Sequence, residues 1–297
     1  MIPGSVAPLS VGLALAAALL LAVQALCIRV GTDDGSTAEA LAVVLLVNVA
    51  VYVPAALLRY GLSPDVSLLS FGAFALAGLV GAVVGRAAYY GAIEHLGASR
   101  AEPLKASQPF HASLIAVFVL GETLSASTFV GIALIVGGVA VITAETSRGG
   151  GSRGRRNLGL GLGVGAAFAY GVEPTVATVG LDTGTPLLVG LAVKMTVAAG
   201  VVLAYFTRRG SVTAGLTAQG RRWYVAAGLA NTLFQLAYYG ALSTGTVVVV
   251  VPIVQTSPLF VAALSVVALP RLERVTWQLA AASAVVVLGA IWVTLAG

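Results

Sequence analysis

The sequence predicts an all-α integral membrane protein whose ten transmembrane helices form two inverted five-helix repeats. Three observations lead to this fold class: the composition, the length of the uncharged stretches, and an internal repeat. Of the 297 residues, 59% are apolar and only 9% are charged, whereas about 25% are charged in an ordinary soluble domain. A soluble chain needs far more polar surface to cover its core, so the composition excludes a cytosolic enzyme.

Apolar stretches of about 20 residues that hold few or no charges are long enough to cross the hydrocarbon core of a bilayer as helices. In the first half they lie at Pro8–Ile28, Ala40–Leu58, Leu68–Ile93, Ser99–Leu120 and Thr123–Ala144. In the second half they lie at Leu158–Gly180, Pro186–Phe206, Val275–Ala296 and within Trp223–Pro270, a stretch that Ser243–Thr246 divides into two helices. The sequence therefore predicts ten membrane-spanning helices, five in each half.

The two halves of the chain repeat each other at a fixed offset. The run Ala88–Ala92 returns as Ala237–Ala241, 149 residues later. Two prolines six residues apart return at the same offset, Pro103 as Pro252 and Pro109 as Pro258. Because each half holds an odd number of helices, the second half is expected to lie upside down relative to the first. Inverted repeats of this kind are typical of secondary transporters.

The repeat divides the chain into two predicted domains, residues 1–147 and residues 158–297. Between them, residues 148–157 contain Gly149–Gly151 and four arginines. Glycines make a chain flexible and the charges keep it solvated, so this segment is predicted to be the linker between the repeats.

The arginines predict how the helices are oriented in the cell membrane. Twelve arginines lie in the loops that follow odd-numbered helices, whereas Arg59 alone lies on the opposite side. Because cytoplasmic loops carry an excess of Lys and Arg, both termini of this multi-pass protein are expected outside the cytoplasm.

A few charged groups remain inside the predicted helices. The only two lysines, Lys105 and Lys194, are among them, together with Arg86, Glu102 and Glu173. A charge in the middle of a bilayer costs at least about 2.5–3.5 kcal/mol, so each is expected to face the interior of the bundle. The residues predicted to line a central substrate-binding cavity are Lys194, Arg86, Lys105, Gln235, Gln24, Tyr89 and Tyr238.

The repeat supports this selection, because Arg86 is equivalent to Gln235 and Glu173 is equivalent to Gln24. For each charged group a purely structural role stays open. Arg86 is expected either to contact substrate or to form an ion pair with one of the buried glutamates. Lys105 lies one helical turn from Glu102, so an ion pair within the helix is an equal alternative. Glu173 is predicted either to couple transport to protons or to neutralise a buried cation.

The segment Arg100–Phe110, followed by Leu120–Leu124 and Gly137–Gly138, resembles the EamA-type repeat of the drug/metabolite transporter superfamily. The second half resembles it through Ser257–Pro258, Leu269–Glu273 and Gly289, although its Leu-Gly-Glu turn is degenerate. The resemblance covers nearly the whole chain. It implies ten helices in two inverted repeats and a central cavity built by both halves. The superfamily's substrates include amino acids, drugs, nucleotide sugars and sugar phosphates.

The sequence thus favours a secondary transporter that moves a small polar or anionic metabolite by alternating access. Three buried cations against two buried carboxylates leave a net charge of +1 for an anion to neutralise. The alternative is a proton-coupled exporter of drugs or amino acids. An enzyme is not expected, because the chain has one cysteine and two histidines and no nucleophile, base and acid set.

No cofactor and no metal site are predicted. The expected partners are a small-molecule substrate and the lipid bilayer, and no basic-aromatic stripe indicates nucleic acid. The sequence leaves the oligomeric state, monomer or homodimer, open.

Overall fold

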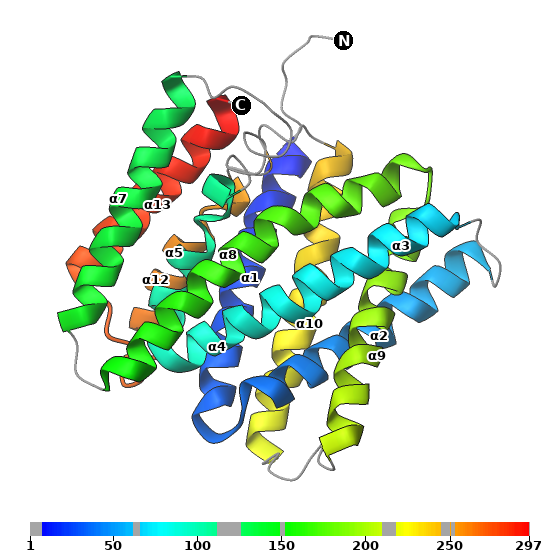
Figure 1. The fold of residues 1–297 in the computed structure, drawn as a ribbon, viewed down its shortest axis with the longest axis horizontal. Helices are drawn as coiled ribbons and strands as arrows, with labels where there is room; N and C mark the ends of the chain where they lie inside the picture. Colours follow the sequence, from blue (N-terminus) through cyan, green and yellow to red (C-terminus); the bar gives the residue numbers. More distant parts are fainter. Residues whose placement is uncertain are drawn as a thin grey trace.

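A bundle of helices makes up the computed structural model (Figure 1). The structure describes residues 8–61, 66–111, 126–148, 152–209, 218–244, 250 and 253–296, and within these ranges all regular structure is helical. The first half contains α1 (Pro8–Asp34), α2 (Thr37–Tyr60), α3 (Leu68–Ala77), the π-helix η1 (Gly78–Gly85), α4 (Arg86–Leu96), α5 (Ala98–Lys105) and α7 (Ala126–Arg148). The second half contains α8 (Arg153–Asp182), α9 (Leu187–Arg209), α10 (Ala218–Thr244), α12 (Ser257–Ala268) and α13 (Trp277–Ala296).

Six of the helical segments are long and apolar enough to cross a membrane. They are Pro8–Asp34, Thr37–Tyr60, Leu68–Leu96, Ala126–Thr146, Arg153–Asp182 and Leu187–Arg208. Large apolar side chains on the outside of the bundle, such as Leu58, Leu68 and Val267, are 90%, 87% and 81% exposed. Such an apolar surface is suited to lipid rather than water. The count of ten spans also depends on segments outside the described residues and stays a prediction.

Several boundaries differ from those expected, and three of these differences have a local cause. Helix α1 continues to Asp34 instead of ending at Ile28, because its last turn is held by the Arg29–Asp33 ion pair. The predicted span Ser99–Leu120 is not one continuous helix, since α5 ends at Lys105 and a turn follows. Helix α8 begins at Arg153, inside the predicted linker, because the Ser152 side chain caps its first turn.

The turn after α5 has a counterpart 149 residues later. The N–H of Ser107 donates to the carbonyl of the third residue before it at 3.2 Å, and its hydroxyl donates to the same carbonyl at 2.6 Å. Thr256 makes the same two bonds at 3.1 and 2.6 Å. A proline follows two residues after each, and its missing N–H prevents a regular helix there. The sequence repeat is therefore also a repeat of local structure.

Helices of the two halves pack mainly on each other. Helix α1 lies against α10, and its repeat equivalent α8 lies against α3, η1 and α4. The pairs α2 with α9 and α7 with α13 each join equivalent helices, α5 also lies against α12, and Figure 1 shows the pair α7 and α13 along one edge of the bundle. The largest apolar core accordingly contains residues of both halves, such as Tyr52, Tyr90 and Tyr224. The two halves therefore form one folded body.

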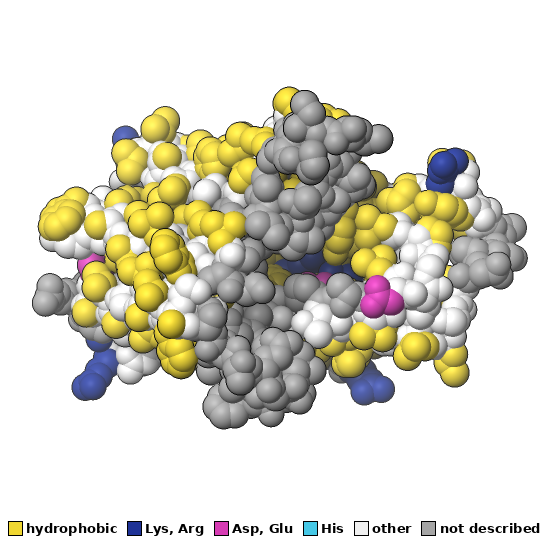
Figure 2. Space-filling view, turned by 90° about the horizontal axis from the view of Figure 1, so that it is seen from above, with side chains coloured by type: hydrophobic (Ala, Val, Ile, Leu, Met, Phe, Trp, Pro, Cys, Tyr) yellow, Lys and Arg dark blue, Asp and Glu magenta, His cyan; other side chains and the backbone are white. Residues whose placement is uncertain are grey.

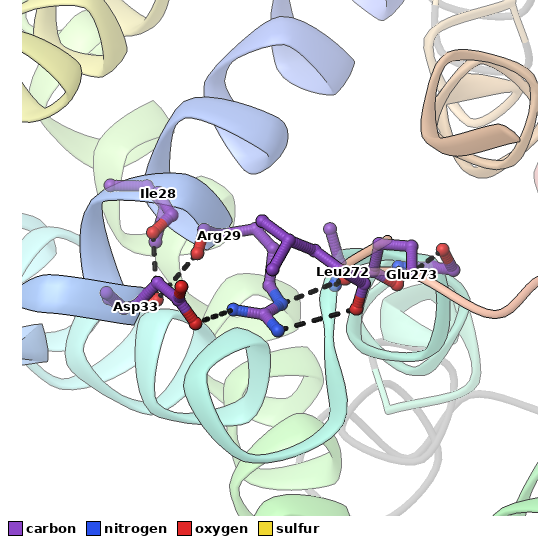
Figure 3. Close-up of polar contacts among 8 residues, drawn as sticks. Ile28, Arg29, Asp33, Leu272 and Glu273 are labelled. Carbon is purple, nitrogen blue, oxygen red and sulfur yellow. Dashed lines mark hydrogen bonds and ion pairs between the residues drawn. The ribbon is translucent and has the colours of Figure 1, made fainter. Parts of the chain in front are cut away.

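One buried carboxylate connects three segments at one end of the bundle (Figure 3). Glu273, only 4% exposed, forms an ion pair with Arg29 of α1 at 3.1 Å. It also accepts from the backbone N–H groups of Ala98 and Ser99 at 2.8 and 3.3 Å, and from the Ser99 hydroxyl at 2.7 Å. A negative charge at these free N–H groups stabilises the start of α5. Glu273 thus links α1, α5 and the segment that precedes α13.

Candidate functional site

A cavity of about 150 Å³ lies between the two halves. A cavity of about this volume admits a molecule the size of benzene. Figure 2 views the end of the bundle where α1 begins and α13 ends, and basic and acidic side chains are visible inside a central hollow. The described residues that line the cavity are Leu21, Gln24, Gly81, Ala82, Arg86, Tyr89, Lys105, Gln108, Tyr170, Glu173, Lys194, Asn231, Phe234, Gln235, Tyr238, Val254 and Gln255.

The structure brings together all the residues predicted for the site, including Glu173, around this one cavity. The lining also follows the internal repeat, because most of its members occur in pairs 149 residues apart. These pairs are Leu21 and Tyr170, Gln24 and Glu173, Ala82 and Asn231, Arg86 and Gln235, Tyr89 and Tyr238, and Lys105 and Val254. Only the tyrosine pair keeps the same residue. The positions are therefore symmetric, whereas the charges are not.

The first buried ion pair joins two helices of the second half. Nζ of Lys194 on α9 lies 2.6 Å from Oε1 of Glu173 on α8. A methyl group on Gly81 would lie 2.4 Å from Cγ of Glu173, and one on Gly78 would lie 2.5 Å from the Lys194 carbonyl. The glycines of η1 thus allow α8 and α9 to pack closely against it. The sequence predicts that Glu173 either couples transport to protons or neutralises a buried cation. The structure contains the contact of the second role, with Lys194 as the cation.

The second ion pair lies within α5. Nζ of Lys105 is 2.6 Å from Oε1 of Glu102, which is fully buried and also accepts from the Ser257 hydroxyl at 2.6 Å. The Tyr89 hydroxyl donates to the other oxygen of Glu102. Nζ of Lys105 also lies 4.6 Å from the centre of the Tyr89 ring, in the geometry of a cation–π contact. Glu102 and Tyr89 therefore hold Lys105 at the cavity wall.

Arg86 is the buried cation without a carboxylate partner in the described part of the chain. Its two terminal nitrogens donate to Oδ1 of Asn48 and Oδ1 of Asn231, each at 3.1 Å. The residue is 5% exposed and follows directly on η1. Both glutamates that the sequence offered as partners are bound to lysines instead. The Arg86 guanidinium is thus held in place by neutral amides while its charge faces the cavity.

A chain of amide side chains fixes the polar wall beside Arg86. The Asn231 amide donates to Oε1 of Gln24 at 3.0 Å, and the Gln24 amide donates to the Tyr90 hydroxyl at 2.9 Å. The Gln235 amide donates to Oδ1 of Asn231 at 3.1 Å. Connected buried amides of this kind hold each other in defined orientations. The wall is therefore organised before any ligand arrives.

One hydrogen-bond donor at the cavity has no partner. Gln255 is 5% exposed, and its Oε1 accepts from the Gln108 amide at 3.5 Å. Its Nε2 has no hydrogen-bond partner within the described part of the chain. A buried donor without a partner costs about 1–3 kcal/mol, so a ligand that accepts from this amide is favoured here.

Sequence reasoning did not select several residues that the structure places at the site. Asn48 and Asn231 orient Arg86, and Tyr170 and Gln255 line the cavity. Asn48 and Asn231 are polar groups within apolar runs, which is a usable signal. Tyr170 is the equivalent of an aliphatic residue, so the repeat gives no sign of it. Among the described residues there is no group of three or more His, Cys, Asp or Glu that could hold a metal ion.

Long apolar helices packed around a buried, charged cavity define a multi-pass membrane protein of the transporter class. The comparison with known families agrees. The sequence profile of the EamA-like transporter family matches residues 8–144 and 157–295. The chain belongs to this family. It is therefore a membrane transporter of the drug/metabolite superfamily and not an enzyme, built from two EamA repeats.

A solved crystal structure of another protein has the same fold. It superimposes with a TM-score of 0.63 at 18% sequence identity, over 95% of this chain and 94% of that chain. At this identity the likeness concerns the fold alone. No curated protein matches the chain.

Proposed function

We propose that this protein is a secondary transporter that moves a small anionic metabolite across the cell membrane by alternating access. Ten helices in two inverted repeats would form the path, with the substrate bound in the central cavity. The observation that carries the proposal is Arg86, a buried guanidinium that faces the cavity and, among the described residues, donates to neutral amides and to no carboxylate. A bound anion would supply the missing counter-charge.

The charges around the cavity support this choice of substrate. Arg86, Lys105 and Lys194 carry three positive charges, and Glu102 and Glu173 carry two negative ones. Taking an ion out of water costs several kcal/mol unless an opposite charge compensates it. An anion relieves this cost at Arg86, whereas a cation would add a fourth positive charge. The free Nε2 of Gln255 offers a further donor to an anionic oxygen.

The two ends of the bundle differ, and this difference supports a transport cycle. Charged side chains are visible from the end where α1 begins (Figure 2), while Glu273 ties α1, α5 and the segment before α13 together elsewhere (Figure 3). In our proposal, opening the cavity toward the Glu273 end requires that the Arg29–Glu273 ion pair separates. The protein would open in this way when a bound anion neutralises the charge of Arg86.

The proposal is tested by a binding screen and a transport assay. Purified protein is melted in the presence of succinate, glycerol 3-phosphate, glutamate, arginine or ethidium, because a ligand that binds the folded state raises the melting temperature. We expect at least one anion to raise it and arginine and ethidium to leave it unchanged. Uptake of the binding anion into proteoliposomes then checks transport. Stabilisation by the cations alone would refute an anion site.

A second function, proton-coupled export of drugs or amino acids, is favoured by one observation. Glu173 is a carboxylate at the cavity wall, bound to Lys194, so a proton on Glu173 would free the lysine. Transport that follows an imposed pH gradient in the native protein, and no longer does so in Glu173→Gln, supports this coupling. Transport that is equally fast with and without a pH gradient removes it.

We also propose that both termini lie outside the cytoplasm. The basis is the excess of arginines in the loops that follow odd-numbered helices. A protease-sensitive tag on either terminus is expected to be cut when protease is added outside cells whose cell membrane is intact. Protection of both tags would reverse the orientation.

A further inference from the structure

A second pocket, separate from the central cavity, is unusually rich in arginine. Its volume is about 430 Å³, and its walls come from the end of α4, the start of α5, the end of α7, the start of α8 and the segment between α12 and α13. The arginines that line it are Arg100, Arg155, Arg156, Arg271 and Arg274. So many like charges around one hollow repel each other unless an anion lies between them.

Carboxylates of the described residues leave most of this charge uncompensated. Arg100 is paired with Glu145, with its Nε 3.2 Å from the carboxylate. The other four arginines form no ion pair within the described ranges. Arg155 donates instead to a ring nitrogen of His95 at 3.3 Å, which brings no negative charge. Nε of Arg156 is buried and has no hydrogen-bond partner.

A buried hydroxyl provides an independent sign of a ligand. Thr146 lines the same pocket and is 6% exposed, yet its Oγ1 has no hydrogen-bond partner among the residues that the structure describes. Buried hydroxyl groups are nearly always paired, because leaving one unpaired costs about 1–3 kcal/mol. Helix α8, 30 residues long, also begins at this pocket, and the free N–H groups at a helix start attract anions.

We infer that this pocket binds a phosphate group, either the headgroup of an anionic phospholipid or a soluble phosphate compound. Phosphate offers several acceptor oxygens and a negative charge, which match the planar donors of arginine and the hydroxyl of Thr146. The position favours the lipid, because Trp277, 75% exposed, starts α13 close to the pocket-lining Arg274 in sequence. Exposed tryptophans mark the level of the lipid headgroups.

The experiment measures binding to the purified full-length protein in a nonionic detergent. The probes are short-chain phosphatidylglycerol, the zwitterionic phosphatidylcholine, and soluble glycerol 3-phosphate, each followed by melting temperature and native mass spectrometry. The variants are Arg156→Gln in the pocket and Arg222→Gln, an equal loss of charge at an exposed position of α10 outside the pocket. Thr146→Val is a nearly isosteric second probe that keeps the charge.

We expect phosphatidylglycerol to raise the melting temperature, Arg156→Gln to weaken this binding about tenfold, and Arg222→Gln to leave it within about twofold. The same titration in Arg86→Gln distinguishes binding in this pocket from binding in the central cavity. The variant removes the unpaired charge of the cavity and leaves the pocket unchanged, so lipid binding should persist. Binding of glycerol 3-phosphate as strong as that of the lipid identifies a soluble phosphate as the ligand. Binding of the lipid alone identifies the headgroup.

Three results overturn the inference. The first is no response to either phosphate source. The second is an equal response to phosphatidylcholine and phosphatidylglycerol. The third is an equal loss of binding in Arg156→Gln and Arg222→Gln, because binding would then depend on the net charge of the protein and not on this pocket. If Arg156→Gln does not fold, unchanged lipid binding in Thr146→Val overturns the inference instead.

Discussion

Replacing Arg86 by glutamine removes one positive charge from the cavity wall and leaves a shorter polar side chain that can still donate one hydrogen bond. In the native protein this guanidinium donates to Asn48 and Asn231 at 3.1 Å and has no carboxylate partner in the described residues. The folded protein therefore loses no ion pair in the variant, and the cost of burying an uncompensated charge disappears. We expect Arg86→Gln to fold and to melt close to the native temperature.

The loss of anion binding should be large. A hydrogen bond from a charged donor contributes about 1.5–3 kcal/mol, and two opposite unit charges about 4 Å apart at an effective dielectric constant of about 20 attract by about 4 kcal/mol. Each 1.4 kcal/mol corresponds to a factor of about ten. The affinity for the anion with the largest melting shift should therefore fall roughly 10-fold to 1000-fold. Titrated melting curves and proteoliposome uptake measure it.

The repeat provides a matched control at the equivalent position, Gln235. This residue also lines the cavity and donates to Asn231, but it carries no charge. Gln235→Met removes one neutral hydrogen bond, worth about 0.5–1.5 kcal/mol. Its effect on affinity should be much the smaller of the two. Anion affinity within about threefold of native in Arg86→Gln, or equal losses in both variants, would refute the role of the Arg86 charge.

Three further predictions concern stability. Glu273→Gln removes the buried negative charge that Arg29 and the first N–H groups of α5 share, although Arg29 keeps its ion pair with Asp33. The free energy of unfolding should therefore fall by about 1–3 kcal/mol; an unchanged melting temperature contradicts the role of this contact. Gly81→Ala places a methyl group 2.4 Å from Glu173 and should cost about 1–3 kcal/mol. Gly72→Ala, inside α3 where a methyl group meets nothing within 4 Å, should instead leave stability unchanged or raise it by up to about 1 kcal/mol. Lys194→Met and Glu173→Gln should each destabilise the protein more than the double variant does, because the double variant leaves no unpaired charge. Additive effects on the melting temperature would show that the two side chains do not interact.

Local signals in the sequence were sufficient for some parts of the fold. The i,i+3 spacing of Glu102 and Lys105 offered an ion pair within one helix, and that pair is present. The return of Pro109 as Pro258 marked two equivalent positions, and the turns before these prolines have the same hydrogen bonds. The extension of α1 into its polar end was missed, because a helix that leaves the membrane is no longer marked by hydropathy.

The sequence by itself determined the membrane character, the repeat and the short set of residues that share one cavity. It could do so because apolar length and a fixed offset both specify position along a helix. Only the tertiary structure decided how the buried charges pair. Lys194 meets Glu173 across two helices, and Arg86 is left to two asparagines. Such pairing depends on how each helix is rotated and how closely it packs, which the order of residues along the chain does not specify.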